Sequence, residues 1–363
     1  MDCLQDWPEP VVRVQSLSES GAATIPARYV KPSSERPGAE HATSEGAAGI
    51  PVIDLAGLAG DSGRCRATMR AVWDACREWG FFQVVNHGVN AELMRRAREE
   101  WRGFFHLPMA EKQAYANSPR TYEGYGSRLG VERGALLDWV DYYFLHILPE
   151  SLKNHDKWPA QPASCRETVE EYCREVVKLC RMLMRVMSMG LGLDVGYLQR
   201  AFGGDDEGVC MRVNYYPRCP QPDLTLGLSA HSDPGGLTVL LADDLIGGLQ
   251  VRRGHAWVTV RPVPEAFVVN VGDQIQVLSN GLYRSVEHRA VVNAEEERIS
   301  LAFFYNPRSD LPIGPARELA TPDRPPLYPA MTFDEYRLDI RKKGPRGKPP
   351  LLDSGLHAHD LVV

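Results

Sequence analysis

The sequence contains no run of about 18 apolar residues, the length that a membrane-spanning helix needs. It has no basic excess either. With 41 lysines and arginines against 47 aspartates and glutamates, the net charge is −6, so neither nucleic acid nor an acidic membrane surface is indicated as a partner. The N-terminus, MDCLQDWPEP, lacks the basic and apolar segments of a secretory signal. We therefore expect a cytoplasmic protein, with access to the nucleus by diffusion.

None of the eight cysteines belongs to a CxxC pair, which argues against a zinc site. Several cysteines occupy apolar positions of expected helices, so we expect buried, reduced thiols. The longest such helix, over residues 164–189, repeats its apolar residues at i, i+3 and i+4. The Met and Cys content of this helix indicates core packing rather than a metal site.

With 363 residues and 44% hydrophobic content, the chain can bury a substantial core. Residues 1–49 are expected to form an N-terminal arm and flexible linker, and residues 50–155 an N-terminal region. Residues 156–345 would form the core, with a long supporting helix and a C-terminal helix, before a disordered tail at 346–363. From residue 208 onward, short runs with period two predict an antiparallel sandwich or jelly roll, so the expected class is α+β.

The best candidates for metal ligands are His231, Asp233 and His288. The first two stand at i and i+2, so they point the same way on an extended backbone. Two imidazoles and one carboxylate, with positions left open, suit a non-haem Fe(II) oxygenase. A zinc hydrolase would accept the same ligands, so the pattern alone does not choose the metal.

Arg298 and Ser300 favour iron, because they supply an anchor for a carboxylate after the last metal ligand. They also stand at i and i+2 and so share one face of a strand. A guanidinium group binds a carboxylate through two hydrogen bonds, and the hydroxyl adds another donor. An anchored carboxylate beside an open iron site is what 2-oxoglutarate requires. The alternative is an arginine on the surface of an edge strand.

The motifs REWGFFQVVNHGV, NYYPRCPQP, HSDPGG, SVEHR and RISLAFFYNP resemble those of the plant 2-oxoglutarate/Fe(II)-dependent dioxygenase superfamily, over residues 50–345. The resemblance implies a double-stranded β-helix (jelly-roll) core flanked by helices. It also implies that 2-oxoglutarate and dioxygen react at Fe(II) to give succinate, carbon dioxide and a hydroxylated product, with ascorbate as reductant. Within this family, the Asn and second Tyr of NYYP contact 2-oxoglutarate, which assigns that role to Asn214 and Tyr216.

Strand alternation places Arg212 on the same face as Asn214 and Tyr216. A buried arginine is costly without a partner, and Arg298 already serves the cosubstrate. Arg212 is therefore expected to hold a second acid, the substrate. The alternative is an ion pair with an Asp or Glu inside the protein.

The same alternation places Phe304 on the face of the cosubstrate anchor, and Phe144 is expected to form the opposite wall of the pocket. In the expected helix FDEYRLDIR, Phe333 and Arg337 are four residues apart and share a face. One apolar and one cationic group suit a small amphipathic acid. For Arg337, the alternative is a solvated charge on a terminal helix. Asp273, in VGDQ, is expected to fix a turn through its own backbone.

A finer resemblance concerns the segments WPEPVVRVQSLSESG, SPRTYEGYGSRLGVERGALLDW and MTFDEYRLDIRKKGPRGK, which are similar to the jasmonate-induced oxygenase (jasmonic acid oxidase) group. In that group, two arginines hold the jasmonate carboxylate in a phenylalanine-lined pocket, and carbon 12 is hydroxylated. The resemblance gives these roles to Arg212 and Arg337, with Phe144, Phe304 and Phe333 as walls.

The function implied is hydroxylation of jasmonic acid to 12-hydroxyjasmonate, which lowers the active hormone pool. One alternative is a hydroxylase for flavonoids or for other specialised metabolites or hormones, although two cationic pocket groups count against neutral polyphenols. The other is a catalytically silent ligand receptor on the same scaffold. The intact set of metal ligands argues against this receptor.

Overall fold

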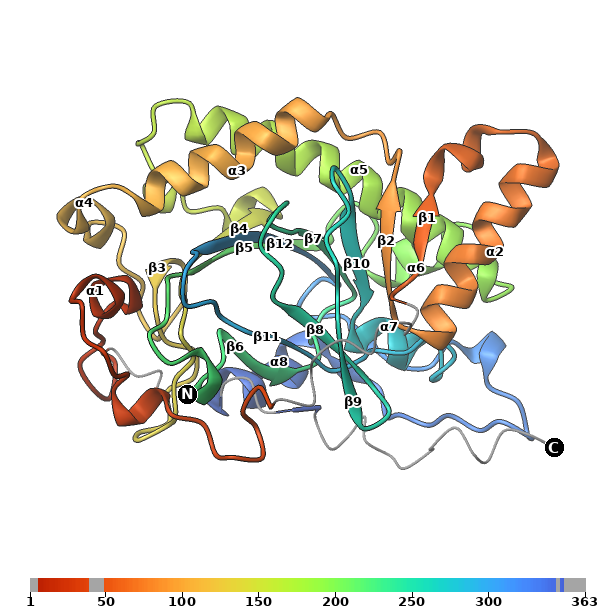
Figure 1. Ribbon diagram of the computed structural model, residues 1–363. Helices are drawn as coiled ribbons and strands as arrows, with labels where there is room; N and C mark the ends of the chain where they lie inside the picture. Colours follow the sequence, from red (N-terminus) through yellow and green to blue (C-terminus); the bar gives the residue numbers. More distant parts are fainter. Residues whose placement is uncertain (1–5, 39–48, 344–346, 349–363) are drawn as a thin grey trace.

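The computed structural model describes residues 6–38, 49–343 and 347–348 (Figure 1). Most of the expected linker and of the expected C-terminal tail therefore lies outside the described residues. Of the described helices, none is long and apolar enough to cross a membrane.

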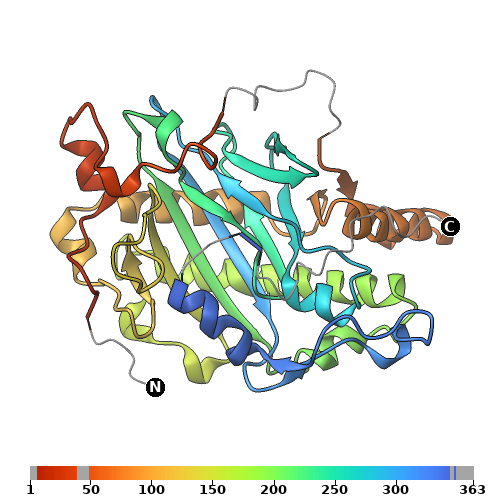
Figure 2. The same cartoon turned by 90° about the horizontal axis from the view of Figure 1, so that it is seen from below.

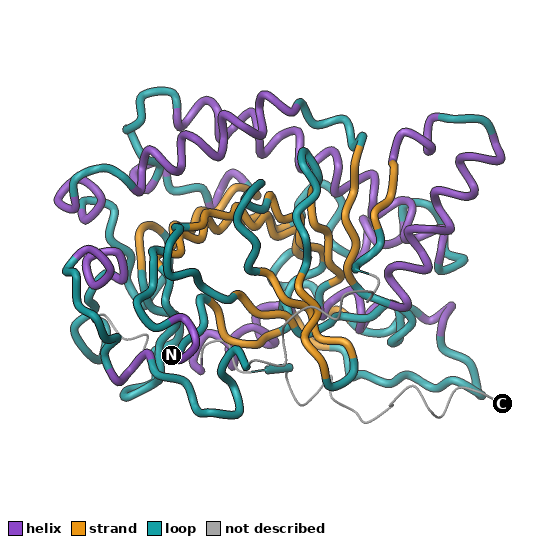
Figure 3. The backbone as a smooth tube through the Cα atoms, in the orientation of Figure 1, coloured by secondary structure: helices purple, strands orange, loops and turns teal. Residues whose placement is uncertain are grey.

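The centre of the fold is an eight-stranded sheet that faces a four-stranded sheet, which confirms the expected jelly-roll core (Figures 1 and 3). The large sheet has the order β1 (Val52–Asp54), β2 (Phe81–Val85), β10 (Phe267–Val271), β7 (Leu237–Leu241), β12 (Arg298–Asn306), β5 (Gly208–Tyr216), β4 (Asp141–Leu148) and β3 (Gly124–Gly126). The small sheet has the order β6 (Leu228–His231), β11 (His288–Ala290), β8 (Leu249–Arg253) and β9 (Ala256–Thr259). A further pair, β13 (Pro312–Ile313) and β14 (Met331–Thr332), lies near the C-terminus.

Helices cover the outer face of the large sheet, where α3 (Ala91–Phe105) and α5 (Cys165–Gly190) run side by side (Figure 1). The predicted apolar stripe of α5 is buried along its length, which confirms its role in the core. α2 (Ser62–Glu78) begins where Asp61 accepts hydrogen bonds from the first backbone N–H groups, and α3 begins in the same way at Asn90. The remaining helices are α1 (Val14–Glu19), α4 (Met109–Gln113), α6 (Tyr197–Ala201), α7 (Asp273–Leu278) and α8 (Phe333–Lys343).

Two details differ from the pattern in the sequence. The run after β10 forms the helix α7, and within the period-two run at residues 285–293 only the three residues His288–Ala290 form a strand. All six residues of α7 are buried, and the sequence there lacks the i, i+3, i+4 spacing of apolar residues that predicts a helix. The large sheet also joins β1–β4 to the later strands, so the division of the chain at residue 155 remains a prediction.

The N-terminal arm packs against the barrel along one edge, as Figure 2 shows in red. The carboxylate of Asp141 is fully buried and accepts hydrogen bonds from the backbone N–H groups of Val14 (2.8 Å) and Gln15 (3.0 Å). Further along the arm, Lys31 forms an ion pair of 2.8 Å with Asp138. The described part of the arm is therefore part of the folded structure.

Candidate active site

The three predicted metal ligands come together at the edge of the small sheet. His231 ends β6 and lies directly opposite His288 of β11, while Asp233 follows in the next turn. Asp233 Oδ1 is 3.6 Å from His231 Nε2 and 3.7 Å from His288 Nε2. One ligand atom from each residue lies within 4.8 Å of the others, so the three can hold a single metal ion. This donor set, with other coordination positions open, fits Fe(II).

Hydrogen bonds fix which atom of each ligand is offered to the metal. His231 Nδ1 lies 2.8 Å from the carbonyl oxygen of Ser229, and His288 Nδ1 lies 3.3 Å from that of Val286. Because a carbonyl only accepts, each Nδ1 carries the proton and each Nε2 is left for the metal. Asp233 Oδ2 accepts from Thr238 Oγ1 (2.6 Å) and Asn270 Nδ2 (2.8 Å), which leaves Oδ1 for the metal.

The electrostatics of the ligands favour a bound cation. Burial and the neighbouring His231 lower the pKa of His288 to about 4, so His288 is neutral near pH 7. Burial opposes the charge on His231, but the hydrogen bond and charge of Asp233 raise the pKa of His231 above its ordinary value. Burial would raise the pKa of Asp233, but His288, His231 and Asn270 lower it well below its ordinary range. The carboxylate is therefore ionised.

The predicted anchors for 2-oxoglutarate lie on two adjacent strands of the large sheet. Arg298 is paired with Tyr216, and Ser300 with Asn214, in the register of β12 and β5. All four side chains are buried. Arg298 Nε and Asn214 Oδ1 have no hydrogen-bond partner among the described residues. Buried polar atoms without partners are rare, so their presence here fits a polar cosubstrate.

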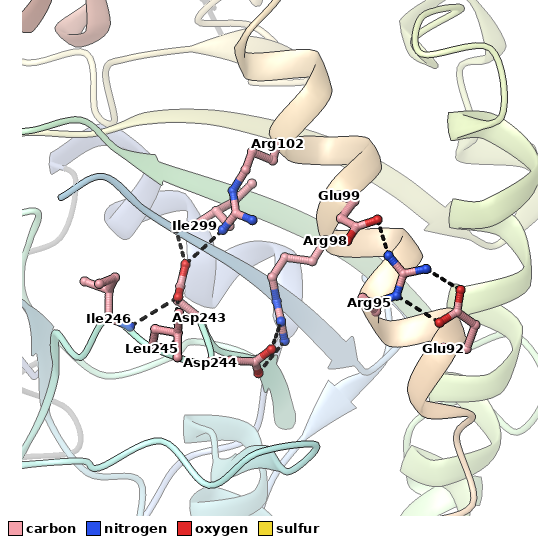
Figure 4. Close-up of polar contacts among 10 residues, drawn as sticks. All are labelled: Glu92, Arg95, Arg98, Glu99, Arg102, Asp243, Asp244, Leu245, Ile246 and Ile299. Carbon is pink, nitrogen blue, oxygen red and sulfur yellow. Dashed lines mark hydrogen bonds and ion pairs between the residues drawn. The ribbon is translucent and has the colours of Figure 1, made fainter.

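In the loop between β7 and β8, Gly248 lies beside the side chain of Arg298. Figure 4 shows how the preceding part of this loop is held. The carboxylate of Asp243 accepts hydrogen bonds from the backbone N–H groups of Leu245 and Ile246 and from Arg102 of α3. It also accepts a 3.4 Å bond from the N–H of Ile299, the residue after Arg298. The neighbouring Asp244 pairs with Arg98. These contacts fix the loop over the start of β12.

Arg212 lies in the row of side chains next to the cosubstrate anchors, between Phe144 of β4 and Ala302 of β12. Arg212 is 9% exposed, and its Nε and Nη2 atoms have no hydrogen-bond partner among the described residues. Arg212 forms no ion pair with any residue that the structure describes. Burial lowers the pKa of Arg212, although the charges of Asp138 and Asp233 act on it and raise its pKa. Its guanidinium group lies 4.4 Å from the ring centroid of Tyr142, which stabilises the positive charge.

The remaining predicted residues fall into two groups. Phe304 lies between Cys210 and Thr238 in the same sheet, and Thr238 is the residue that holds Asp233. Phe333 and Arg337 lie on α8, where the Arg337 guanidinium is 5.2 Å from the ring centroid of Phe333. Here Arg337 is paired with Asp334 and its side chain is 25% exposed. Within the described ranges, no hydrogen bond, ion pair or ring contact joins these two α8 residues to Arg212.

Three residues that support the site were not predicted from the sequence, namely Tyr142, Thr238 and Asn270. Tyr142 lies two residues before Phe144 on β4, so the alternation of side chains along a strand places both on the same face and could have predicted that Tyr142 faces the site. Asn270 is a polar residue inside an apolar strand, which is also a usable signal. The expectation for Asp273 is wrong: its carboxylate accepts bonds from the hydroxyl groups of Ser232, Ser285 and Tyr336 rather than from its own backbone.

A cavity of about 590 Å³ lies between the N-terminal arm, the 127–142 segment and the small sheet. Tyr142, Ser229 and Arg289 are among the described residues that line this cavity, and none of the predicted site residues is. It borders the metal site, because Ala230 and Glu287 in its lining directly precede His231 and His288.

Comparisons with known proteins agree with this geometry. The profile of the 2OG-Fe(II) oxygenase superfamily matches residues 207–307, and that of the non-haem dioxygenase in morphine synthesis N-terminal region matches residues 50–161. Jasmonate-induced oxygenase 2 of Arabidopsis thaliana is 59% identical over 95% of this chain and 93% of the relative. Flavanone 3-dioxygenase 2 of Oryza sativa subsp. japonica is 45% identical over 89% of this chain and 92% of the relative.

Solved structures give the same result. The crystal structure of JOX2 in complex with 2OG, Fe and JA is similar with a TM-score of 0.88 and 59% identity, over 94% of this chain and 97% of that one. Fe(II) and 2-oxoglutarate are thus the cofactor and cosubstrate of this enzyme. The chain belongs to the 2OG-Fe(II) oxygenase superfamily and, within it, to the jasmonate-induced oxygenases.

Proposed function

We propose that this enzyme binds jasmonic acid through its carboxylate and hydroxylates it at carbon 12. The observation that carries the proposal is the buried guanidinium group of Arg212, which forms no ion pair with any acid among the described residues. It lies in the row next to Asn214 and Ser300, on the face that carries the cosubstrate anchors. A site with a second carboxylate receptor suits a substrate that is itself an acid.

The energetics of Arg212 support an acidic ligand. An unpaired buried charge costs several kcal/mol, and a cation–π contact such as that with Tyr142 returns only about 2 kcal/mol. A substrate carboxylate would supply the missing hydrogen bonds, with two parallel bonds to the guanidinium. The relatives point in the same direction, because the chain is 59% identical to jasmonate-induced oxygenases and to the JOX2 that was crystallised with JA.

Each group of residues then has a role. His231, Asp233 and His288 hold the iron, and Arg298, Ser300, Asn214 and Tyr216 hold 2-oxoglutarate. The loaded site supplies oxidative decarboxylation of 2-oxoglutarate coupled to hydroxylation of a nearby C–H bond. Arg212 and Arg337 bind the substrate carboxylate, for which Arg337 exchanges its pairing with Asp334. Phe144, Phe304 and Phe333 form apolar walls that orient the carbon chain and exclude water. Hydroxylation removes jasmonic acid from the hormone pool.

The direct test is incubation of the purified enzyme with jasmonic acid, Fe(II), ascorbate and 2-oxoglutarate in air, followed by mass spectrometry. We expect a product with one added oxygen atom at carbon 12 and an equal amount of succinate. Succinate without any oxidised jasmonate would reject the substrate and leave the class intact. Hydroxylation at another carbon would reject only the assigned position.

A flavonoid hydroxylase is the second candidate, and the 45% identity to flavanone 3-dioxygenase 2 of rice favours it. A neutral flavanone would leave Arg212 without a counter-ion, which is the physical argument against this candidate. The same assay with naringenin in place of jasmonic acid separates the two. Faster turnover of the flavanone than of the acid would favour the second candidate.

We also propose that the enzyme acts in the cytosol, with access to the nucleus by diffusion. Five of the seven described cysteines are buried and none of the seven forms a disulfide, which suits a reducing compartment. A fluorescent fusion should show diffuse cytosolic signal, and a signal confined to an organelle would reject this location.

A further inference from the structure

The carboxylate of Asp273, at the start of α7, receives hydrogen bonds from three parts of the chain. It accepts from Ser232 Oγ at 3.2 Å, from Ser285 Oγ at 2.6 Å and from the Tyr336 hydroxyl at 2.7 Å. Asp273 is fully buried, and its backbone N–H donates to the carbonyl oxygen of Asp233 at 2.8 Å. A buried carboxylate that accepts three hydrogen bonds from hydroxyl groups keeps those groups in place. Breaking any one of these hydrogen bonds would leave part of the buried charge without a partner, which is costly.

The partners of Asp273 belong to the two metal-ligand segments and to the helix α8. Ser232 stands between the ligands His231 and Asp233, and Ser285 stands three residues before His288. Tyr336 is on α8, directly before Arg337, and its side chain is buried. One carboxylate thus connects both metal-ligand segments to the helix that carries a proposed substrate residue.

A second residue of α7 strengthens this connection. Gln276, one turn after Asp273, accepts a hydrogen bond from the backbone N–H of Ser285 at 2.8 Å. It also donates to the hydroxyl of Tyr328 at 3.0 Å, in the segment that leads to α8. The helix α7 therefore links the metal-ligand segments to the C-terminal segment at two points.

We infer that Asp273 and Tyr336 are positioning residues. They couple the packing of α8 against the core to the binding of iron and 2-oxoglutarate at the metal site. Loading the site with iron and 2-oxoglutarate stabilises the ligand segments, which hold Asp273, and Asp273 holds α8 through Tyr336. Conversely, substrate bound by Arg337 keeps α8 in place and favours the ordered metal site. Such coupling is reciprocal by thermodynamic necessity. Only the role of Arg337 in this inference rests on the proposed function.

The first experiment needs no organic substrate. Hydrogen exchange of the α8 amides, residues 333–343, is measured with and without Fe(II) and 2-oxoglutarate under anaerobic conditions, so no turnover occurs. We expect loading to slow α8 exchange about tenfold in the unmodified enzyme, as a coupling of about 1.4 kcal/mol would. In Tyr336→Phe most of this slowing should disappear.

The matched control is Tyr283→Phe. The hydroxyl of Tyr283 is also buried and donates one hydrogen bond, to the carbonyl oxygen of Met187 at 3.0 Å, away from α8. This variant should keep the full effect of loading on α8. The inference would be overturned if Fe(II) and 2-oxoglutarate did not change the exchange rate of the α8 amides in the unmodified enzyme. It would also be overturned if they slowed this exchange equally in Tyr336→Phe and in the unmodified enzyme. If Tyr336→Phe does not fold, Asp273→Asn replaces it, with the same loss expected.

The second experiment uses turnover of jasmonic acid. In Tyr336→Phe we expect the KM for jasmonic acid to rise about tenfold, the KM for 2-oxoglutarate to stay within about twofold, and the ratio of hydroxylated product to succinate to fall. If the KM for jasmonic acid and the ratio of product to succinate did not change, Tyr336 would have no positioning role in substrate binding. If the unmodified enzyme does not hydroxylate jasmonic acid, the proposed function fails, and the exchange experiment still decides the coupling.

Discussion

At the scale of single residues, the site depends on hydrogen bonds that leave one atom of each ligand for the metal. His231 and His288 each donate from Nδ1 to a backbone carbonyl, and Asp233 accepts two bonds at Oδ2. Despite burial, Asp233 raises the pKa of His231, whereas burial lowers that of His288, so His231 is the ligand that more readily takes up a proton. A second proton on His231 would occupy Nε2, the atom left for the metal, because Nδ1 already donates to Ser229.

Metal binding should therefore release a proton. The pKa of His231 is raised by Asp233 despite burial, whereas His288 has a pKa of about 4 and Asp233 is already ionised, so His231 is the ligand that gives up a proton to the metal. We expect net release of protons when Co(II) binds at pH 6.5. The affinity should weaken as the pH falls, by up to about tenfold per unit.

Titration calorimetry of Co(II) binding in buffers with different ionisation enthalpies measures this release. At a pH well above the pKa of His231, the release should vanish and the affinity should level off. Binding at pH 6.5 without any proton release would contradict the assigned protonation.

The orientation of Arg212 could be predicted from the sequence, because side chains two residues apart on a strand point to the same face. The register confirms this, since Arg212, Asn214 and Tyr216 are paired in order with Ala302, Ser300 and Arg298. The role of Tyr142 was not predicted, although the same rule applies to it. Its importance comes from contact with Arg212, and a contact between strands depends on a register that one sequence does not give.

At the scale of elements, the loop between β7 and β8 depends on a glycine at its close approach to Arg298. A Cβ at Gly248 would lie 3.0 Å from the carbonyl oxygen of Val291, 3.2 Å from Arg298 Cδ and 3.3 Å from Arg298 Nε. These distances are tighter than ordinary van der Waals contact, so a side chain here must displace Arg298 or the loop. At the adjacent Gly247, a Cβ would meet nothing within 4 Å.

Gly248→Ala should therefore weaken binding of 2-oxoglutarate. We expect its KM to rise about fivefold, equivalent to about 1 kcal/mol, with little change in the KM of the organic substrate. Steady-state kinetics with varied 2-oxoglutarate measures this change, and Gly247→Ala is the matched control. Equal values for the two variants would show that the loop does not position Arg298.

The helix α7 marks the limit of prediction at this scale. Its role comes from contacts with residues 232, 285, 328 and 336, which lie far apart in the sequence. No local periodicity encodes contacts of this kind. The complete burial of α7 also removed the alternation that distinguishes a helix from a strand.

At the scale of the whole molecule, the N-terminal arm is part of the core. Val14, Ile25 and Tyr29 of the arm form an apolar cluster with Leu137, Trp139 and Cys219. Leu137 and Trp139 belong to the segment that leads into β4, the strand that carries Tyr142 and Phe144. The division of the chain into an arm and linker at 1–49, an N-terminal region at 50–155, a core at 156–345 and a tail at 346–363 remains a proposal.

Two valines of the arm test whether it unfolds with the rest of the protein. Val14 is fully buried, whereas Val12 is 52% exposed. Val14→Ala should lower the free energy of unfolding by about 2 kcal/mol, while Val12→Ala should change it by less than about 0.5 kcal/mol. Urea denaturation followed by circular dichroism measures both values. If Val14→Ala proved as harmless as Val12→Ala, the arm would not belong to the cooperative unit.

The central claim is that Arg212 receives the carboxylate of an acidic substrate. Its most direct test compares kcat/KM for jasmonic acid and for its neutral methyl ester, in the unmodified enzyme and in Arg212→Gln. We expect the unmodified enzyme to prefer the acid by about 100-fold, equivalent to about 2.7 kcal/mol, and the variant to lose at least about tenfold of that preference. The same preference for the acid in both enzymes would contradict the claim.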